Sequence, residues 1–190
     1  ETDLLEKILP VLEEGKSLRT VSFNDEEQKL LKGFQLLTIK PILYVANVNE
    51  DGFESNPFLN QIYDLANKES SEVVAICAEL EAEISGLANE EKIEFLKELG
   101  LEEPGLDRLT RAGYKLLGLQ TYFTAGEKEV RAWTINVGDS APKAAGKIHT
   151  DFERGFIRAE TVTFDDYIQN NGEKGSKAVS YTHLRAHETD

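Results

Sequence analysis

Side chains that could hydrogen-bond a purine ring follow the end of a short apolar run. Residues 42–46 are continuously apolar, which is typical of a buried parallel strand, and Asn47, Val48 and Glu50 come soon after them. Parallel strands of an open α/β sheet deliver their carboxyl ends to the ligand crevice. An Asn there can orient a loop or bond a ring nitrogen, and a carboxylate two or three residues later can accept from ring N–H groups. The alternative is a solvated loop, because a four-residue NxxE pattern also arises by chance.

A second apolar run, residues 73–78, ends in Cys77 and Ala78, where a second loop in contact with the base would lie. In GTPases the corresponding NKxD motif uses its Asp to accept from the N1 and N2 hydrogens of guanine. Here Glu50 stands at the Asp position and Val48 at the Lys position, so the arrangement that fits guanine is broken. For the Cys77 sulfur the favoured interpretation is a small buried hydrophobe.

The three histidines give little support for other chemistry. His149 stands without a nucleophile motif, and a lone histidine is more often a structural hydrogen-bonding residue than a catalyst. His183 and His187 are four residues apart and Glu188 follows, a spacing that resembles a helical metal pair. The order HExxH is not met and no third ligand is evident, so we predict no metal site.

The elements that would position these loops alternate between helix and strand in the first half of the chain. The predicted helices are 4–12, 30–37, 57–66, 80–87 and 93–99. Asn24 and Glu27 form a capping-box pattern ahead of the second of them. Strand, helix, strand and helix in succession predict a parallel sheet of the α/β type. Two strands are few for such a sheet, so we expect further strands from a preceding segment.

The second half changes to the two-residue period of strands. The predicted strands are 119–124, 130–137 and 156–164, the first two joined as a hairpin. Asp139 or Ser140 caps a short helix that runs to Ile148. A last helical turn opens at Asp165 and Asp166. Hairpin, helix and strand are the start of a small β-grasp domain.

Charge and composition limit the classes of function. The 190 residues carry 21 Lys and Arg against 35 Asp and Glu, a net charge of -14, which argues against a chain that coats nucleic acid or an anionic membrane. Residues 1–112 hold 11 basic and 24 acidic side chains, whereas residues 113–178 hold nine of each. With Glu103-Pro104-Gly105 interpreted as a helix end, this predicts a domain boundary near residue 112. No apolar run approaches the roughly 20 residues that span a bilayer, and the single cysteine fits a reducing compartment.

Several longer segments resemble one family. Residues 40–50 resemble the base-specificity strand and NxxE motif of the YchF-type Obg-like ATPases. Segments within 106–119 resemble the part of that family that leads into its TGS domain. Residues 121–135 are similar to the TGS hairpin, and residues 145–160 to its helix and next strand. The resemblance covers about residues 1–178.

This resemblance implies a cytoplasmic P-loop nucleotidase that prefers ATP, works with Mg, and binds the large ribosomal subunit or RNA through its TGS domain. It implies that Asn47, Val48 and Glu50 help to select adenine and that Cys77 and Ala78 line the base. The phosphate-binding run GxxxxGK[ST] and the magnesium-binding switch segments of the family are not found in this sequence. We therefore assign no catalytic residue and expect a C-terminal fragment that is inactive alone. The alternative is a TGS-type ribosome- or RNA-binding module that does no enzymatic work.

The predicted fold class is α/β plus α+β, in three parts. These are a helical-arm remnant (1–37), the C-terminal part of a P-loop parallel-sheet domain (38–112) and an incomplete β-grasp TGS domain (113–178). Residues 179–190 resemble a translated sequencing-library adapter, and we expect them to contribute nothing to the fold. The truncated TGS domain would leave a sheet edge open, with which this tail could pair through Val179, Tyr181 and Leu184.

Overall fold

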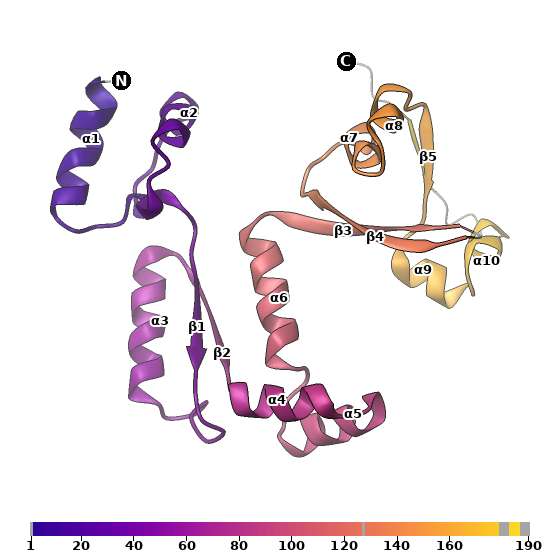
Figure 1. Ribbon diagram of the computed structural model, residues 1–190, viewed down its shortest axis with the longest axis horizontal. Helices are drawn as coiled ribbons and strands as arrows, with labels where there is room; N and C mark the ends of the chain where they lie inside the picture. The colour runs from indigo at the N-terminus through magenta and orange to yellow at the C-terminus, as the bar shows by residue number, and fades with distance from the viewer. Residues whose placement is uncertain (1, 127, 179–182, 187–190) are drawn as a thin grey trace. The chain divides into compact units, whose positions relative to one another are not determined.

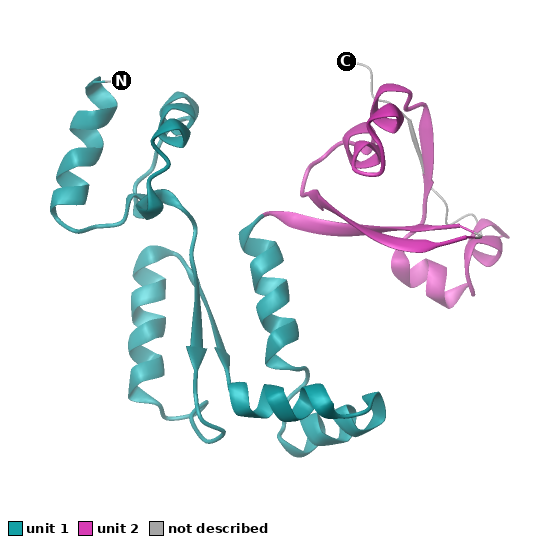
Figure 2. Ribbon diagram, in the orientation of Figure 1, with its two compact units in different colours: residues 1–117 teal, residues 118–190 magenta. Residues whose placement is uncertain are grey.

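The computed structural model describes residues 2–126, 128–178 and 183–186 (Figure 1). The chain divides into two compact units, residues 1–117 and 118–190, which are coloured separately in Figure 2. Its architecture is mixed α/β, with three two-stranded sheets among the described residues. In the part of the chain that the structure describes, no helix is long and apolar enough to cross a membrane.

The first unit opens with two helices around a small apolar core. The elements are α1 (Thr2–Glu13), η1 (Leu18–Thr20), α2 (Asp25–Phe34) and η2 (Leu37–Ile39). Their buried side chains are Leu4, Ile8, Leu18 and Leu31. The predicted capping box is confirmed, since Asn24 Oδ1 accepts from the Glu27 N–H and the Asn24 N–H donates to Glu27 Oε2, each at 2.9 Å. The second helix ends earlier than predicted, at Phe34, because Gln35 adopts the left-handed conformation.

A parallel strand pair follows, with a helix on each side of it. β1 (Leu43–Asn47) pairs with β2 (Glu72–Ile76), and α3 (Pro57–Glu69) connects them. α3 covers the face that carries Ala46, Val48 and Ala75, while α6 lies on the opposite side (Figure 1). The two predicted strands and the helix that begins at Pro57 are thus confirmed.

Three helices complete the first unit: α4 (Ala78–Gly86), α5 (Asn89–Glu98) and α6 (Gly105–Leu116). The first two confirm the helices predicted at 80–87 and 93–99. The third was not predicted, because the Pro104-Gly105 pair was interpreted as a helix end. In the structure Pro104 is the N-cap of α6, where a missing N–H does no harm, and the helix continues through residue 112. The predicted domain limit at 112 therefore falls inside a helix.

The second unit begins with the predicted hairpin. β3 (Leu119–Ala125) pairs antiparallel with β4 (Val130–Asn136), and the Gly126 N–H donates to the Glu129 carbonyl across the turn. The helix predicted up to Ile148 ends two residues earlier, as α7 (Ala141–Gly146), and a further short helix that was not predicted follows it, α8 (Thr150–Arg154). Ser140 is the N-cap residue of α7, although its side chain makes no capping hydrogen bond.

The remaining elements are β5 (Arg158–Thr161), α9 (Phe164–Gln169), α10 (Glu173–Ala178) and β6 (His183–Ala186). The third predicted strand is shorter than 156–164, because Thr163 Oγ1 accepts from the Asp166 N–H and so begins α9 at Phe164. β6 pairs antiparallel with β5, from Arg158 opposite Ala186 to Thr161 opposite His183. This confirms the expectation that the tail can pair with an open strand edge, with Leu184 opposite Glu160. That the tail contributes nothing to the stability of the fold stays a prediction. Val179 and Tyr181 lie outside the described residues.

Candidate functional site

The two predicted loops meet at the carboxyl end of the parallel strand pair. Asn47, the last residue of β1, lies opposite Ile76, the last residue of β2, so Cys77 and Ala78 follow directly beside it. The Val48 N–H donates to the Ile76 carbonyl at 2.8 Å, which continues the ladder one residue past the end of β1. The parallel register therefore places both loops at one edge of the sheet.

Asn47 joins these loops directly. Its Oδ1 accepts from the backbone N–H of Ala78 at 3.0 Å. Ala78 is the first residue of α4, and the N-cap residue, Cys77, makes no side-chain capping bond. The Asn47 amide therefore satisfies one of the N–H groups that a helix start leaves without an intrahelical partner. The sequence suggested that Asn47 either orients a loop or bonds a ring nitrogen of the base. This hydrogen bond orients the loop.

Val48 and Cys77 turn their side chains into the protein. Val48 is 9% exposed and packs in the apolar cluster beneath α3, and Cys77 is 3% exposed. The interpretation of Cys77 as a small buried hydrophobe is confirmed. Only backbone atoms of these two residues can therefore face a ligand above the sheet edge. Glu50 and Ala78, by contrast, are exposed.

A compact turn presents Glu50. The Gly52 N–H donates to the Asn49 carbonyl at 2.9 Å, and Asn56 Nδ2 donates to the Gly52 carbonyl at 3.0 Å. Asn56 also caps α3, because its Oδ1 accepts from the Phe58 N–H at 3.1 Å. One side chain thus fixes both the turn and the start of the next helix, which limits where the Glu50 carboxylate can reach.

The buried carboxylate of Glu81 joins α4, the helix that follows the second loop, to the start of α6, and no local sequence pattern indicated this role. Glu81 is 8% exposed and lies one turn into α4. Its Oε1 accepts from the Gly105 N–H at 2.6 Å, and its Oε2 accepts from the Leu106 N–H at 3.1 Å. These are the first two residues of α6, so Glu81 caps a helix that starts 24 residues later. The available signal was indirect: a helix that starts after Pro104 has no capping side chain of its own.

A polar network around Tyr44 joins the start of the same strand to the end of α3 and to η1. The Tyr44 hydroxyl donates to Glu69 Oε2 at 2.8 Å, and the same oxygen lies 3.4 Å from Arg19 Nη1. The hydrogen bond to Glu69 raises the pKa of Tyr44, and burial and the negative charge of Glu69 act in the same direction. β1 is thus held at its start by this polar network and at its end by Asn47.

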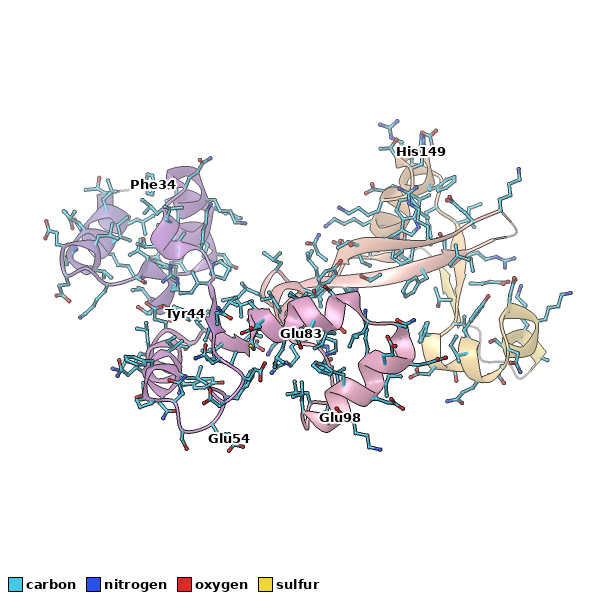
Figure 3. The ribbon with its side chains drawn as sticks, turned by 60° about the horizontal axis from the view of Figure 1, so that its bottom comes forward. Phe34, Tyr44, Glu54, Glu83, Glu98 and His149 are labelled. Carbon is cyan, nitrogen blue, oxygen red and sulfur yellow. The ribbon has the colours of Figure 1, made fainter. Side chains whose placement is uncertain are left out.

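His149 plays the structural role that was predicted for it. Its Nδ1 accepts from the Asp151 N–H at 3.2 Å and so caps α8 (Figure 3). Within the described ranges, no group of three or more His, Cys, Asp or Glu side chains could hold a metal ion. His187 and Glu188, from the other histidine pattern, lie outside those ranges.

Known proteins resemble this chain over nearly its whole length. A family model named YchF-GTPase_C, described as "Protein of unknown function (DUF933)", matches residues 119–189, past residue 178 where we expected the resemblance to end. The "Ribosome-binding ATPase YchF" of Escherichia coli O157:H7 is 60% identical over 177 residues, which are 93% of this chain and 49% of that protein. The protein of the same name from Bacillus subtilis (strain 168) is 50% identical over 191 residues, covering 99% of this chain and 52% of the relative.

A solved structure, that of the Schizosaccharomyces pombe YchF GTPase, superimposes with a TM-score of 0.84 at 31% identity. The match covers 98% of this chain and 50% of that structure. The chain therefore spans about half the length of the relatives and of the structure that it matches.

Proposed function

This chain belongs to the YchF family, and on that premise we propose that it forms part of a ribosome-associated nucleotidase that binds ATP in preference to GTP. Ribosome binding and ATPase activity stand in the names of its relatives. Because the chain spans about half of those proteins, both properties are proposals for the intact protein. Its location would be the cytoplasm, and its partners ATP, Mg and the large ribosomal subunit or RNA.

The hydrogen bond from the Ala78 N–H to Asn47 Oδ1 is the observation that carries the base-binding role. It holds together two loops that in an open α/β sheet border the ligand crevice. Glu50 is exposed beside them and would accept from a donor on the adenine edge. The backbone of Val48 and of Cys77 would shape the floor under the base, since both side chains are buried.

We infer that other residues of the intact protein would hold the phosphates and their metal ion. This sequence holds no P-loop run, and the described residues offer no acidic cluster that fits a magnesium ion. When bound with ATP, magnesium neutralises charge on the transferring phosphoryl group. We assign this chain a part in base recognition and no step of hydrolysis.

The proposed parts are the helical-arm remnant (1–37), the C-terminal part of the nucleotide-binding domain (38–112), the truncated TGS domain (113–178) and an adapter-derived tail (179–190). The parallel pair β1–β2 with helices on both sides supports the second assignment. The hairpin β3–β4 followed by short helices supports the third. These limits remain predictions.

The base-specificity proposal is tested in the full-length protein by measuring dissociation constants for fluorescent ATP and GTP analogues. We expect the unmodified protein to favour ATP, and Glu50→Asp to narrow that preference because a shorter carboxylate suits guanine. Glu54→Asp is the matched control, since Glu54 is exposed in the same loop (Figure 3). Equal constants for ATP and GTP in the unmodified protein would contradict the proposal. Changing Val48 to Lys is a poor test, because it would place a charge in the core.

A second candidate function is a TGS-type module that binds ribosome or RNA without enzymatic work. The division of the chain into two compact units, the second of which begins at Gly118, supports it. The 190-residue chain should then sediment with ribosomes, and it should not hydrolyse ATP because it lacks the phosphate cradle. ATP turnover that persists after contaminating ATPases are removed would contradict both candidate functions, because each of them expects this chain alone to be inactive.

A further inference from the structure

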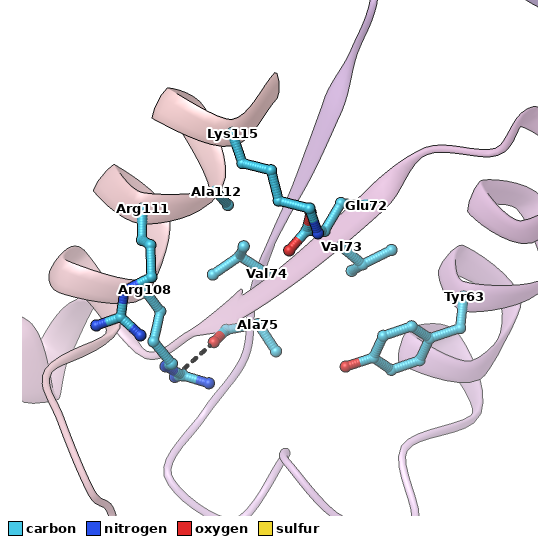
Figure 4. Close-up of a pocket in the computed structure, with 9 residues that line it drawn as sticks. All are labelled: Tyr63, Glu72, Val73, Val74, Ala75, Arg108, Arg111, Ala112 and Lys115. Atoms are coloured by element: carbon cyan, nitrogen blue, oxygen red, sulfur yellow. Dashed lines mark hydrogen bonds and ion pairs between the residues drawn. The ribbon is translucent and has the colours of Figure 1, made fainter. Parts of the chain in front are cut away.

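A cavity of about 330 Å³ runs along the outer edge of β2, away from the base loops (Figure 4). Tyr63 of α3 lies on one side of the strand, and Arg108, Arg111 and Lys115 of α6 lie on the other. Four consecutive strand residues, 72–75, form its floor. Consecutive residues of a strand share a wall only at the strand's edge, because their side chains alternate between the two faces.

Backbone groups of β2 point into this cavity. The Ile76 carbonyl accepts from Val48 on the β1 side, so the alternate residues Val73 and Ala75 direct their N–H and C=O groups outward. No other strand of the described residues pairs with this edge. The Ala75 carbonyl is already occupied, because it accepts from Arg108 Nη2 at 2.9 Å. The N–H groups of Val73 and Ala75 remain as donors.

The side chains add further donors. Arg108 Nε is buried and has no hydrogen-bond partner within the described part of the chain. Arg111 and Lys115 lie three and seven residues further on, along the same side of α6, and pair with Glu103 and Glu72. Both cations keep more than 70% of their side-chain surface exposed, and exposed ion pairs are weak and easily exchanged. Three cations thus gather at one place in the first unit, residues 1–117, whose acidic side chains outnumber its basic ones by 24 to 12.

The balance of donors decides what this cavity can bind. An added β-strand would need the Ala75 carbonyl as an acceptor, and Arg108 holds it. A ligand that only accepts hydrogen bonds fits better, and a guanidinium with an unused N–H is well suited to phosphate oxygens. We propose that the β2 edge is an anion site that binds the phosphate group of a small phosphorylated ligand. It is separate from the base loops and does not depend on the proposed function.

The test is a titration of the ¹⁵N-labelled 190-residue chain with sodium pyrophosphate at constant ionic strength. We expect saturable shifts in the amide signals of Val73 and Ala75 and in the Arg108 Nε–H signal. Arg108→Gln should weaken the affinity about tenfold, since it removes charge-assisted hydrogen bonds. Lys97→Gln, an exposed cation on α5, is the matched control and should leave the affinity unchanged.

Because Arg108 also holds the Ala75 carbonyl, its variant could lose structure. The double variant Arg111→Gln with Lys115→Gln keeps that bond and should still weaken pyrophosphate binding several-fold. Unchanged affinity in the double variant, or shifts that sodium chloride alone reproduces, would overturn the proposal. Citrate that binds as tightly as pyrophosphate would overturn the assignment to phosphate.

Discussion

The two units of the chain are stabilised in different ways. The first buries apolar side chains beneath α1 and α2 and again between α3 and the parallel strands. In the described part of the second, Ile135 is the one buried apolar side chain. The large apolar side chains Phe123, Phe152, Ile157 and Phe164 there are each more than half exposed. The first unit thus has packed cores, and the second relies on its strand ladders and local contacts.

The polar contacts of the two units also differ in how far apart in the sequence their partners lie. In the first, Asn47 and Glu81 connect elements that are 31 and 24 residues apart. In the second, Trp133 donates to Thr124 across the hairpin, and the Arg131 guanidinium lies 4.3 Å from the ring of Trp133. A buried group left without its partner costs more than an exposed pair that water can replace. Breaking the buried contacts of Glu81 should therefore cost more than breaking the exposed contacts in either unit.

Removing the Glu81 carboxylate should have the largest effect. Glu81→Ala leaves the N–H groups of Gly105 and Leu106 without acceptors at a buried helix start. We expect the free energy of unfolding of the first unit to fall by about 3 kcal/mol. Urea unfolding followed by far-UV circular dichroism measures this. Fluorescence of Trp133, the only tryptophan, reports on the second unit and should keep its midpoint.

Glu83→Ala is the matched control, because Glu83 lies on α4 but is exposed (Figure 3). Its effect should stay within about 0.5 kcal/mol. Two results would contradict the proposed difference between the units. One is an equal loss of unfolding free energy in Glu81→Ala and Glu83→Ala. The other is a shift of the Trp133 fluorescence midpoint as large as that of the circular dichroism midpoint.

A methyl group at Gly105 should have the next largest effect. The added Cβ of Gly105→Ala would lie 2.8 Å from Glu81 Oε1 and 2.9 Å from Ile76 Cγ2. Overpacking at this junction should cost about 2 kcal/mol. Gly113→Ala in the same helix meets nothing within 4 Å and should stabilise by about 0.5–1 kcal/mol. Thermal unfolding of the two variants checks the opposite signs, and a shared sign would show that contact with Glu81 is not what limits position 105.

Local signals predicted most of the fold. The Asn24–Glu27 capping box, the strands predicted at 42–46 and 73–78, and the hairpin 119–137 all rest on residues close in sequence, and all are found, the two strands as Leu43–Asn47 and Glu72–Ile76. α6 was missed because a Pro-Gly pair can end or begin a helix. What decided it was a carboxylate 24 residues away, which no local pattern reveals. The predicted strand 156–164 was longer than β5, because Thr163 caps α9 and the chain becomes helical from Phe164 onward.

The structure brings the two predicted loops together, whereas the directions of their side chains did not follow from the sequence motif. Strand ends located Asn47 and Ala78, but only the parallel register brings the amide oxygen within reach of the Ala78 N–H. The burial of Val48 follows from strand alternation with Ala46, a pattern that was available in the sequence and was outweighed by the motif. The role of Glu50 toward a base stays a prediction.

Asn47→Ala should have a smaller effect, because one hydrogen bond is lost at an exposed loop. We expect a loss of about 1 kcal/mol of stability and roughly fivefold faster hydrogen exchange at the Ala78 amide. Asn49→Ala in the neighbouring turn is the control, since the turn uses the Asn49 carbonyl and an alanine keeps it. Exchange at Ala78 that is equally fast in both variants would mean that Asn47 does not hold the second loop.

The smallest effect that we predict is a dependence on acid in the second unit. Lys143 and the backbone N–H of Asn136 bond the Asp139 carboxylate and lower its pKa to about 2. The pKa of an Asp side chain in an unfolded chain is about 3.9. Because the pKa of Asp139 is lower in the folded state, the ionised carboxylate stabilises the second unit at every pH above the unfolded pKa. This stabilisation is lost as the pH falls toward about 2.

The midpoint temperature of thermal unfolding, followed by Trp133 fluorescence, should therefore fall as the pH is lowered from about 4 to about 2. The fall should be less steep in Asp139→Asn. Asp165→Asn, at an exposed position of α9, should retain the decline of the unmodified chain. Identical profiles for the unmodified chain and Asp139→Asn would show that this pair contributes no stability, leaving the hairpin and its helices to hold the second unit without it.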